Sequence, residues 1–124
     1  MNPRVILLLT TDPVVECAAR EAVLATRHGL RVRQSSAEAF RELAEGCADV
    51  DVAVIDLDPG MHGAALLAAA GDRLPVVVLT SLEENYMQPV AKRHGAVGCL
   101  AKPFDAARLR EAIETVLIKT PLEV

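Results

Sequence analysis

The segment from Asp51 to Gly63 constrains the fold of this chain more than any other stretch. It reads Asp-Val-Ala-Val-Ile-Asp-Leu-Asp-Pro-Gly-Met-His-Gly, an apolar run that ends on the carboxylate of Asp56 and then breaks into proline and glycine. A short apolar run bounded by turn formers is typical of a strand that is buried on both faces. We therefore expect Asp56 at the carboxyl end of a strand, the edge at which open α/β sheets bind ligands.

The core of the protein must be aliphatic, because 52% of its 124 residues are hydrophobic but only 2% are aromatic. Such a core is usual for a parallel sheet covered by helices on both sides. The formal net charge of -4 disfavours a nucleic-acid-binding surface, so we expect no direct contact with nucleic acid. No apolar run is long enough to span a membrane, and the widely spaced cysteines Cys17, Cys47 and Cys99 fit the reduced thiols of a cytoplasmic protein.

Strand and helix patterns alternate along the chain. Strands are predicted over residues 4–9, 30–34, 51–56, 75–80 and 97–101, and helices over about 13–28, from 36 to Gly46, over 63–70, from 89 to Gly95, and from Asp105 to 119. Such alternation with short connections requires parallel strands and right-handed crossovers. The predicted fold is a three-layer, doubly wound (βα)5 sandwich of the flavodoxin type. One domain is expected over residues 1–119, with residues 120–124 as a tail or the start of a linker.

Three polar side chains are predicted to meet at the carboxyl edge of this sheet. Asp56, Thr80 and Lys102 each follow an apolar strand pattern. Alone, each has an ordinary explanation as a helix cap, a turn former or a solvated lysine. Together they suit a carboxylate nucleophile that accepts a phosphoryl group, because an ammonium and a hydroxyl can hold the oxygens of the transferred group.

The chain resembles the receiver domain of bacterial two-component response regulators over nearly its whole length. Four segments carry the resemblance: Ile6 to Pro13, Val54 to Gly63, Pro75 to Ser81, and Gly95 to Asp105 with its Leu-Ala-Lys-Pro-Phe-Asp sequence. The resemblance implies the strand order 2-1-3-4-5, Asp56 as phosphoacceptor, Thr80 as switch hydroxyl and Lys102 as phosphoryl-binding lysine. It also implies a cis peptide between Lys102 and Pro103.

The residues that bind Mg²⁺ in that family differ here. The family has two acidic residues directly after the first strand, and this chain has Thr10 and Thr11. Mg²⁺ relies on carboxylates and water, so its binding is predicted to be weak and no cofactor is expected to be obligatory. The candidate ligands are Asp56, Asp12 and the backbone or side chain of Asp58. Asp12 directly precedes Pro13, a position that favours the role of a helix N-cap over that of a metal ligand.

The segments after the acceptor and before the lysine also depart from the family. Pro59 comes one residue early, which can displace the carbonyl of Asp58 that the resemblance makes a metal ligand. Cys99 stands where the family usually has an aromatic residue that turns inward after phosphorylation. A cysteine cannot signal by burying a ring, so that part of the Thr80–Cys99 switch is predicted to be altered.

Two classes of function are compatible with the sequence. In the first, Asp56 accepts a phosphoryl group from a histidine kinase or phosphotransfer protein, and the only reactions catalysed are the domain's own phosphorylation and dephosphorylation. In the second, the chain is a pseudo-receiver, a protein–protein interaction module in which Asp56 stays paired with Lys102. The last two helices and the last strand are candidates for binding an output domain or a second copy of the chain.

Overall fold

The computed structural model describes residues 3–45, 49–57, 63–70, 74–81, 89, 92–93 and 95–119. Its strands are β1 (Val5–Leu9), β2 (Gly29–Arg33), β3 (Val52–Asp56), β4 (Val76–Thr80) and β5 (Gly98–Ala101), and its helices are α1 (Pro13–Leu24), α2 (Ser36–Ala44), α3 (Gly63–Ala70) and α5 (Ala106–Lys119). All strands are parallel, in the order β2-β1-β3-β4-β5. The predicted fold and strand order are confirmed. Residues 90, 91 and 94 of the helix predicted at 89–95 and the tail at 120–124 lie outside the described residues.

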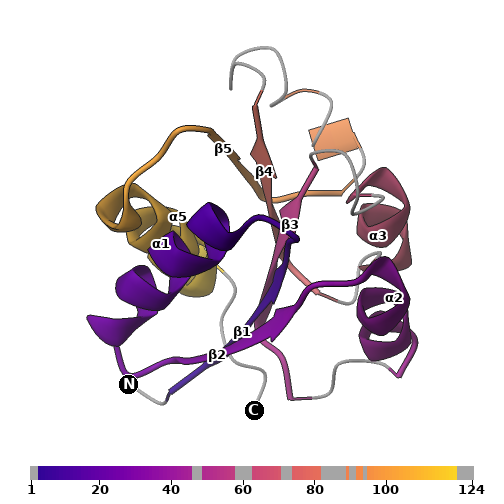
Figure 1. The fold of residues 1–124 in the computed structure, drawn as a ribbon, viewed down its shortest axis with the longest axis horizontal. Helices are drawn as coiled ribbons and strands as arrows, with labels where there is room; N and C mark the ends of the chain where they lie inside the picture. The colour runs from indigo at the N-terminus through magenta and orange to yellow at the C-terminus, as the bar shows by residue number, and fades with distance from the viewer. Residues whose placement is uncertain are drawn as a thin grey trace.

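The sheet is the middle of three layers (Figure 1). Helices α1 and α5 cover one face and pack on side chains that include Leu8, Val54 and Leu79. Helices α2 and α3 cover the other face, over residues that include Ile55 and Val78. Strands β3 and β4 are buried at every position, because helices cover both of their faces.

Side-chain caps fix where the helices begin. Asp12 is the N-cap of α1, and its Oδ1 accepts a hydrogen bond from the backbone N–H of Val14 (2.9 Å). Ser35 caps α2 in the same way through the N–H of Glu38 (3.1 Å). These caps satisfy N–H groups that have no partner within the helix. The cap of α1 also holds Asp12 at the edge where β1 ends.

Helix α1 ends at Leu24 and not at about residue 28, so the sequence-based boundary is wrong at this end. The hydroxyl and the N–H of Thr26 both donate to the carbonyl of Val23, at 2.7 and 2.9 Å. The hydroxyl of Thr26 also accepts from the N–H of His28 (3.1 Å) and turns the chain. Gly29, which directly follows the predicted end of the helix, is the first residue of β2.

Strand β2 forms one edge of the sheet and carries two arginines that point to α2. Arg31 and Arg33 each contact the carboxylate of Glu42 at 3.0 Å, and Arg31 also pairs with Asp49. These ion pairs join the edge strand to the helix beside it. Charged side chains on an edge strand also discourage its pairing with a strand of another molecule.

Two further features complete the described fold. Gly95 has a φ of +95° and its N–H donates to the carbonyl of Lys92 (3.0 Å), a conformation that favours glycine. None of the helices in the described residues is both long and apolar enough to cross a membrane.

Candidate functional site

Asp56 is the last residue of β3 and the centre of the site. Its side chain is 3% exposed, and the next residue, Leu57, donates its backbone N–H to the carbonyl of Leu79 in β4 (2.9 Å). A buried carboxylate needs hydrogen-bond donors or an opposite charge to offset the loss of water. Thr10, after β1, supplies a hydrogen-bond donor, and Lys102, after β5, supplies a positive charge.

Thr10 is the first of these partners. Its hydroxyl donates to Oδ2 of Asp56 at 2.7 Å, and both residues are buried. The register explains the contact: Leu9 pairs with Ile55, so the next residue of each strand, Thr10 and Asp56, lie side by side on the same face. In the sequence, Thr10 stands out only as a position that lacks the family's acidic metal ligand. The adjacency of the first and third strands, which the resemblance implied, is the signal that could have identified the contact.

Lys102 is the second partner. Its Nζ lies 3.0 Å from both Oδ1 and Oδ2 of Asp56. The lysine follows β5, and its backbone N–H donates to the carbonyl of Thr80 at 2.7 Å. The Lys102–Pro103 peptide is cis, as the resemblance implied. The predicted meeting of the carboxylate and the ammonium is therefore present in the structure.

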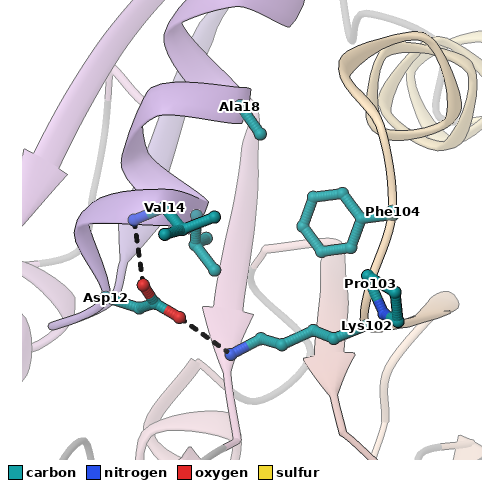
Figure 2. Close-up of a pocket in the computed structure, with 7 residues that line it drawn as sticks. Asp12, Val14, Ala18, Lys102, Pro103 and Phe104 are labelled. Carbon is teal, nitrogen blue, oxygen red and sulfur yellow. Dashed lines mark hydrogen bonds and ion pairs between the residues drawn. The ribbon is translucent and has the colours of Figure 1, made fainter.

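Asp12 lies at the rim of the same site. Figure 2 shows one of its oxygens on the N–H of Val14 and the other facing Lys102, with Oδ2 3.8 Å from Nζ. Its side chain is 39% exposed, whereas that of Lys102 is 15% exposed. Asp12 thus serves as the predicted helix cap and also contributes a second negative charge near the lysine.

Thr80 lies at the same edge, 3% exposed, as the last residue of β4. Its neighbour Leu79 is the register partner of Asp56. Register partners share a face of the sheet, so Leu79 and Asp56 lie on one face. Because side chains alternate along a strand, the side chain of Thr80 leaves β4 on the opposite face. The carbonyl of Thr80 accepts a hydrogen bond from the backbone N–H of Lys102. Its role as a switch hydroxyl stays a prediction.

Of the two remaining predicted site residues, Cys99 and Asp58, the structure describes only Cys99. Cys99 lies on β5, half-buried against the core under α2 and α3, and pairs in register with Val78. Asp58 falls outside the described residues, so its suggested contribution to a metal site stays a prediction.

A pocket of about 380 Å³ lies beside this site. It lies between the start of α1 and the segment that follows β5 (Figure 2). Its walls are mostly apolar, and Asp12 and Lys102 form its charged end. The lining residues are Asp12, Val14, Val15, Ala18, Lys102, Pro103 and Phe104.

The weak Mg²⁺ site suggested by the sequence stays a prediction. No group of three or more His, Cys, Asp or Glu side chains that can hold a metal ion occurs among them. Both oxygens of Asp56 contact Lys102, and one oxygen of Asp12 caps a helix. A hard cation depends on several oxygen ligands, which Thr10 and Lys102 do not replace.

The chain belongs to the response regulator receiver domain family, whose family model matches residues 6–114. A receiver domain is the signal-accepting module of a two-component response regulator. A search of curated protein sequences gives no match.

Solved receiver structures share the fold. The chemotaxis response regulator CheY4 of Vibrio cholerae is 20% identical with a TM-score of 0.80, over 94% of this chain and 100% of that one. A response regulator from Thermotoga maritima is 18% identical with a TM-score of 0.80, over 93% and 98% of the two chains. A LuxR-family two-component response regulator from an Aurantimonas species is 24% identical, again with a TM-score of 0.80, over 95% and 87%. At these identities the similarity establishes the fold.

Proposed function

We propose that the chain acts in a phosphorelay, with Asp56 as the residue that accepts a phosphoryl group from a histidine kinase or a phosphotransfer protein. The observation that carries the proposal is the position of Lys102, whose ammonium contacts both oxygens of Asp56 at 3.0 Å. An ammonium at that position can follow negative charge as it moves onto the oxygens of a transferred phosphoryl group.

The chemistry needs a single displacement at phosphorus. A carboxylate oxygen of Asp56 forms a bond to phosphorus while the bond between phosphorus and the imidazole nitrogen of the donor breaks. That nitrogen keeps the electron pair and takes up a proton. Lys102 holds the phosphoryl oxygens during the transfer, and hydrolysis of the acyl phosphate returns Asp56 to its carboxylate form. The domain then catalyses no reaction other than its own phosphorylation and dephosphorylation.

The response to phosphorylation would pass through β4 and β5. A phosphoryl group on Asp56 competes for Lys102, whose backbone N–H is bonded to the carbonyl of Thr80. When Lys102 moves, its hydrogen bond to Thr80 moves the ends of β4 and β5, which carry Thr80 and Cys99. Phosphorylation would then shift the population between two conformations of these strand ends. Because Cys99 carries no ring, the output depends on backbone and packing changes near it.

The donor must reach Asp56 past the residues around the pocket. Val14 is 74% exposed and lines the same pocket as Lys102. An apolar side chain at the mouth of a charged site suits contact with an apolar partner surface. A phosphotransfer partner is therefore expected to cover Val14 and the segment of Pro103 and Phe104 when it delivers the phosphoryl group.

A second candidate function is supported by the contact of Thr10 with Asp56. The hydroxyl of Thr10 donates to Oδ2 of Asp56, and both residues are buried. Among the described residues, no group of three or more His, Cys, Asp or Glu side chains is placed to hold a metal ion. These observations favour a pseudo-receiver, in which Asp56 is a structural residue and the domain binds its partners without phosphorylation.

Incubation with a radiolabelled small acyl phosphate distinguishes the two functions. The first predicts acid-stable, base-labile labelling of the wild-type protein that Asp56→Asn abolishes and that Asp49→Asn, a change at an exposed aspartate, leaves intact. No labelling of a folded wild-type protein would support the pseudo-receiver. Labelling that persists in Asp56→Asn would show that another residue is the acceptor.

A further inference from the structure

We infer that Thr10 does for Asp56 what a divalent cation does in a receiver that has acidic residues at this position: it holds the carboxylate and offsets its charge without metal. The site would then reach its folded geometry with no Mg²⁺ and would have no measurable affinity for it. This inference does not depend on whether Asp56 is phosphorylated, because it concerns only the unmodified carboxylate.

The hydrogen bonds around Thr10 fix the direction in which its hydroxyl donates. The backbone N–H of Asp12 donates to Oγ1 at 3.0 Å, so the hydroxyl accepts one hydrogen bond there. Its own proton is directed at Oδ2 of Asp56, 2.7 Å away, because an ionised carboxylate can only accept. Thr10 is 1% exposed, so water does not compete freely for either bond. The hydroxyl is therefore a preorganised donor to a buried charge.

The charges explain why a hydroxyl is sufficient. Two carboxylates, Asp12 and Asp56, lie near the single ammonium of Lys102, and Asp12 is partly solvated. A carboxylate in place of the Thr10 hydroxyl would lie in contact with Asp56, and two ionised carboxylates at that distance need a cation between them or a proton. The neutral hydroxyl removes that requirement.

The position of Lys102 closes the space in which a metal would bind. Its Nζ lies 3.0 Å from both oxygens of Asp56 and 3.8 Å from the nearer oxygen of Asp12, so it already bridges the two carboxylates. A divalent ion bound between them would have to displace the ammonium and then bear its positive charge close by. Thr10 supplies no anionic oxygen to offset that repulsion.

The first test titrates Mg²⁺ into the wild-type protein and into Thr10→Asp while amide resonances are followed by NMR. The wild type is expected to show no shifts at Asp56, Thr80 and Lys102 in millimolar Mg²⁺, and no rise in melting temperature. Thr10→Asp is expected to melt at a lower temperature without metal and to recover as Mg²⁺ is added, because binding to the folded state stabilises it. Saturable shifts in the wild-type protein at those residues would overturn the inference.

The second test removes only the hydroxyl. Thr10→Val keeps the shape of the side chain but leaves Oδ2 of Asp56 and the N–H of Asp12 without this partner, and should lower the melting temperature by about 3 °C or more. Thr10→Ser restores the hydroxyl and should restore most of the loss. Thr11→Val, at the exposed neighbouring position, is the matched control and should change the melting temperature little.

The two variants also separate a role in holding Asp56 from simple packing. If Thr10 acts only through its volume, Thr10→Val would be as stable as the wild type and Thr10→Ser would be the destabilised variant. That reversed order would refute the inference even if Thr10→Asp did not fold.

Discussion

The hydroxyl of Thr10 donates to Oδ2 of Asp56 at 2.7 Å, although the two residues are 46 positions apart in the sequence. The contact exists because β1 and β3 are neighbours in the sheet and their last register pair, Leu9 and Ile55, places the following residues together. It makes the carboxylate of Asp56 part of a hydrogen-bonded cluster with Lys102. The cluster ties the ends of β1, β3 and β5 to one another.

Replacing Lys102 by methionine should destabilise the fold. Lys102→Met removes the ammonium that contacts both oxygens of Asp56 and leaves a buried carboxylate that keeps the hydrogen bond from Thr10. We expect a loss of about 3 kcal/mol in the free energy of unfolding at neutral pH, measured by urea denaturation. Asp56→Asn in the same background removes the uncompensated charge, and the double variant should be more stable than Lys102→Met alone. If the losses in free energy of unfolding from the two single substitutions simply added up in the double variant, the two side chains would not be coupled.

His28 should stabilise the fold through two contacts with residues remote in the sequence, which the sequence did not indicate. Its Nδ1 accepts the backbone N–H of Arg4 at 3.0 Å, and its Nε2 lies 3.0 Å from a carboxylate oxygen of Glu114. Nδ1 is therefore an acceptor, and the ring joins Arg4, directly before β1, to Glu114 in α5. Its side chain is only 4% exposed. His28→Ala should lower the free energy of unfolding by about 2 kcal/mol, from the cavity and the unpaired N–H.

Glu114→Gln is the control for that prediction. It keeps an oxygen that can accept from His28 and removes only a charge that is 31% exposed, so the change should stay below about 1 kcal/mol. If the two variants were equally destabilised, the contact with the carboxylate of Glu114, and not the bond to Arg4, would be the important one.

Asp49 should titrate below its usual range. The guanidinium of Arg31 donates hydrogen bonds to Asp49 and lowers the pKa of that carboxyl, and the same bonds raise the pKa of Arg31. A lowered pKa in the folded state means that the pair stabilises the fold above the unfolded-state pKa of aspartate, about 3.9. This contribution is lost as the pH falls through the folded-state pKa.

NMR titration of the side-chain carboxyl carbon measures that pKa directly. Arg31→Met should return the pKa of Asp49 to near its usual value. Arg33→Met should leave it unchanged, because Arg33 pairs with Glu42 in the described structure. An Asp49 pKa that does not respond to Arg31→Met would contradict the prediction.

Much of the fold could be predicted because it depends on local patterns. The apolar runs that end at Asp56 and Thr80 are strands with those ends, and Asp12 caps α1 as its position before Pro13 indicated. The predicted end of α1 was wrong, because Thr26 forms a turn through hydrogen bonds from its hydroxyl and its N–H to the carbonyl of Val23. Hydrophobic periodicity does not reveal such side-chain hydrogen bonds to the backbone.

The candidate site was only partly predictable. The edge at which Asp56 and Lys102 meet follows from the strand pattern and the resemblance. The donor role of Thr10 does not follow from its residue type, because a threonine after a strand is usually a turn former. The same is true of His28, which has no neighbour in the sequence that suggests a contact with Arg4 or Glu114.

The sequence by itself determined the class of fold and the strand ends that bear polar residues, because hydrophobic periodicity and turn formers act over a few neighbouring residues. The tertiary structure alone decided which polar atoms meet. Register and side-chain reach place the Thr10 hydroxyl and the Lys102 ammonium on the two oxygens of Asp56, and those distances arise only when strands remote in the chain become neighbours.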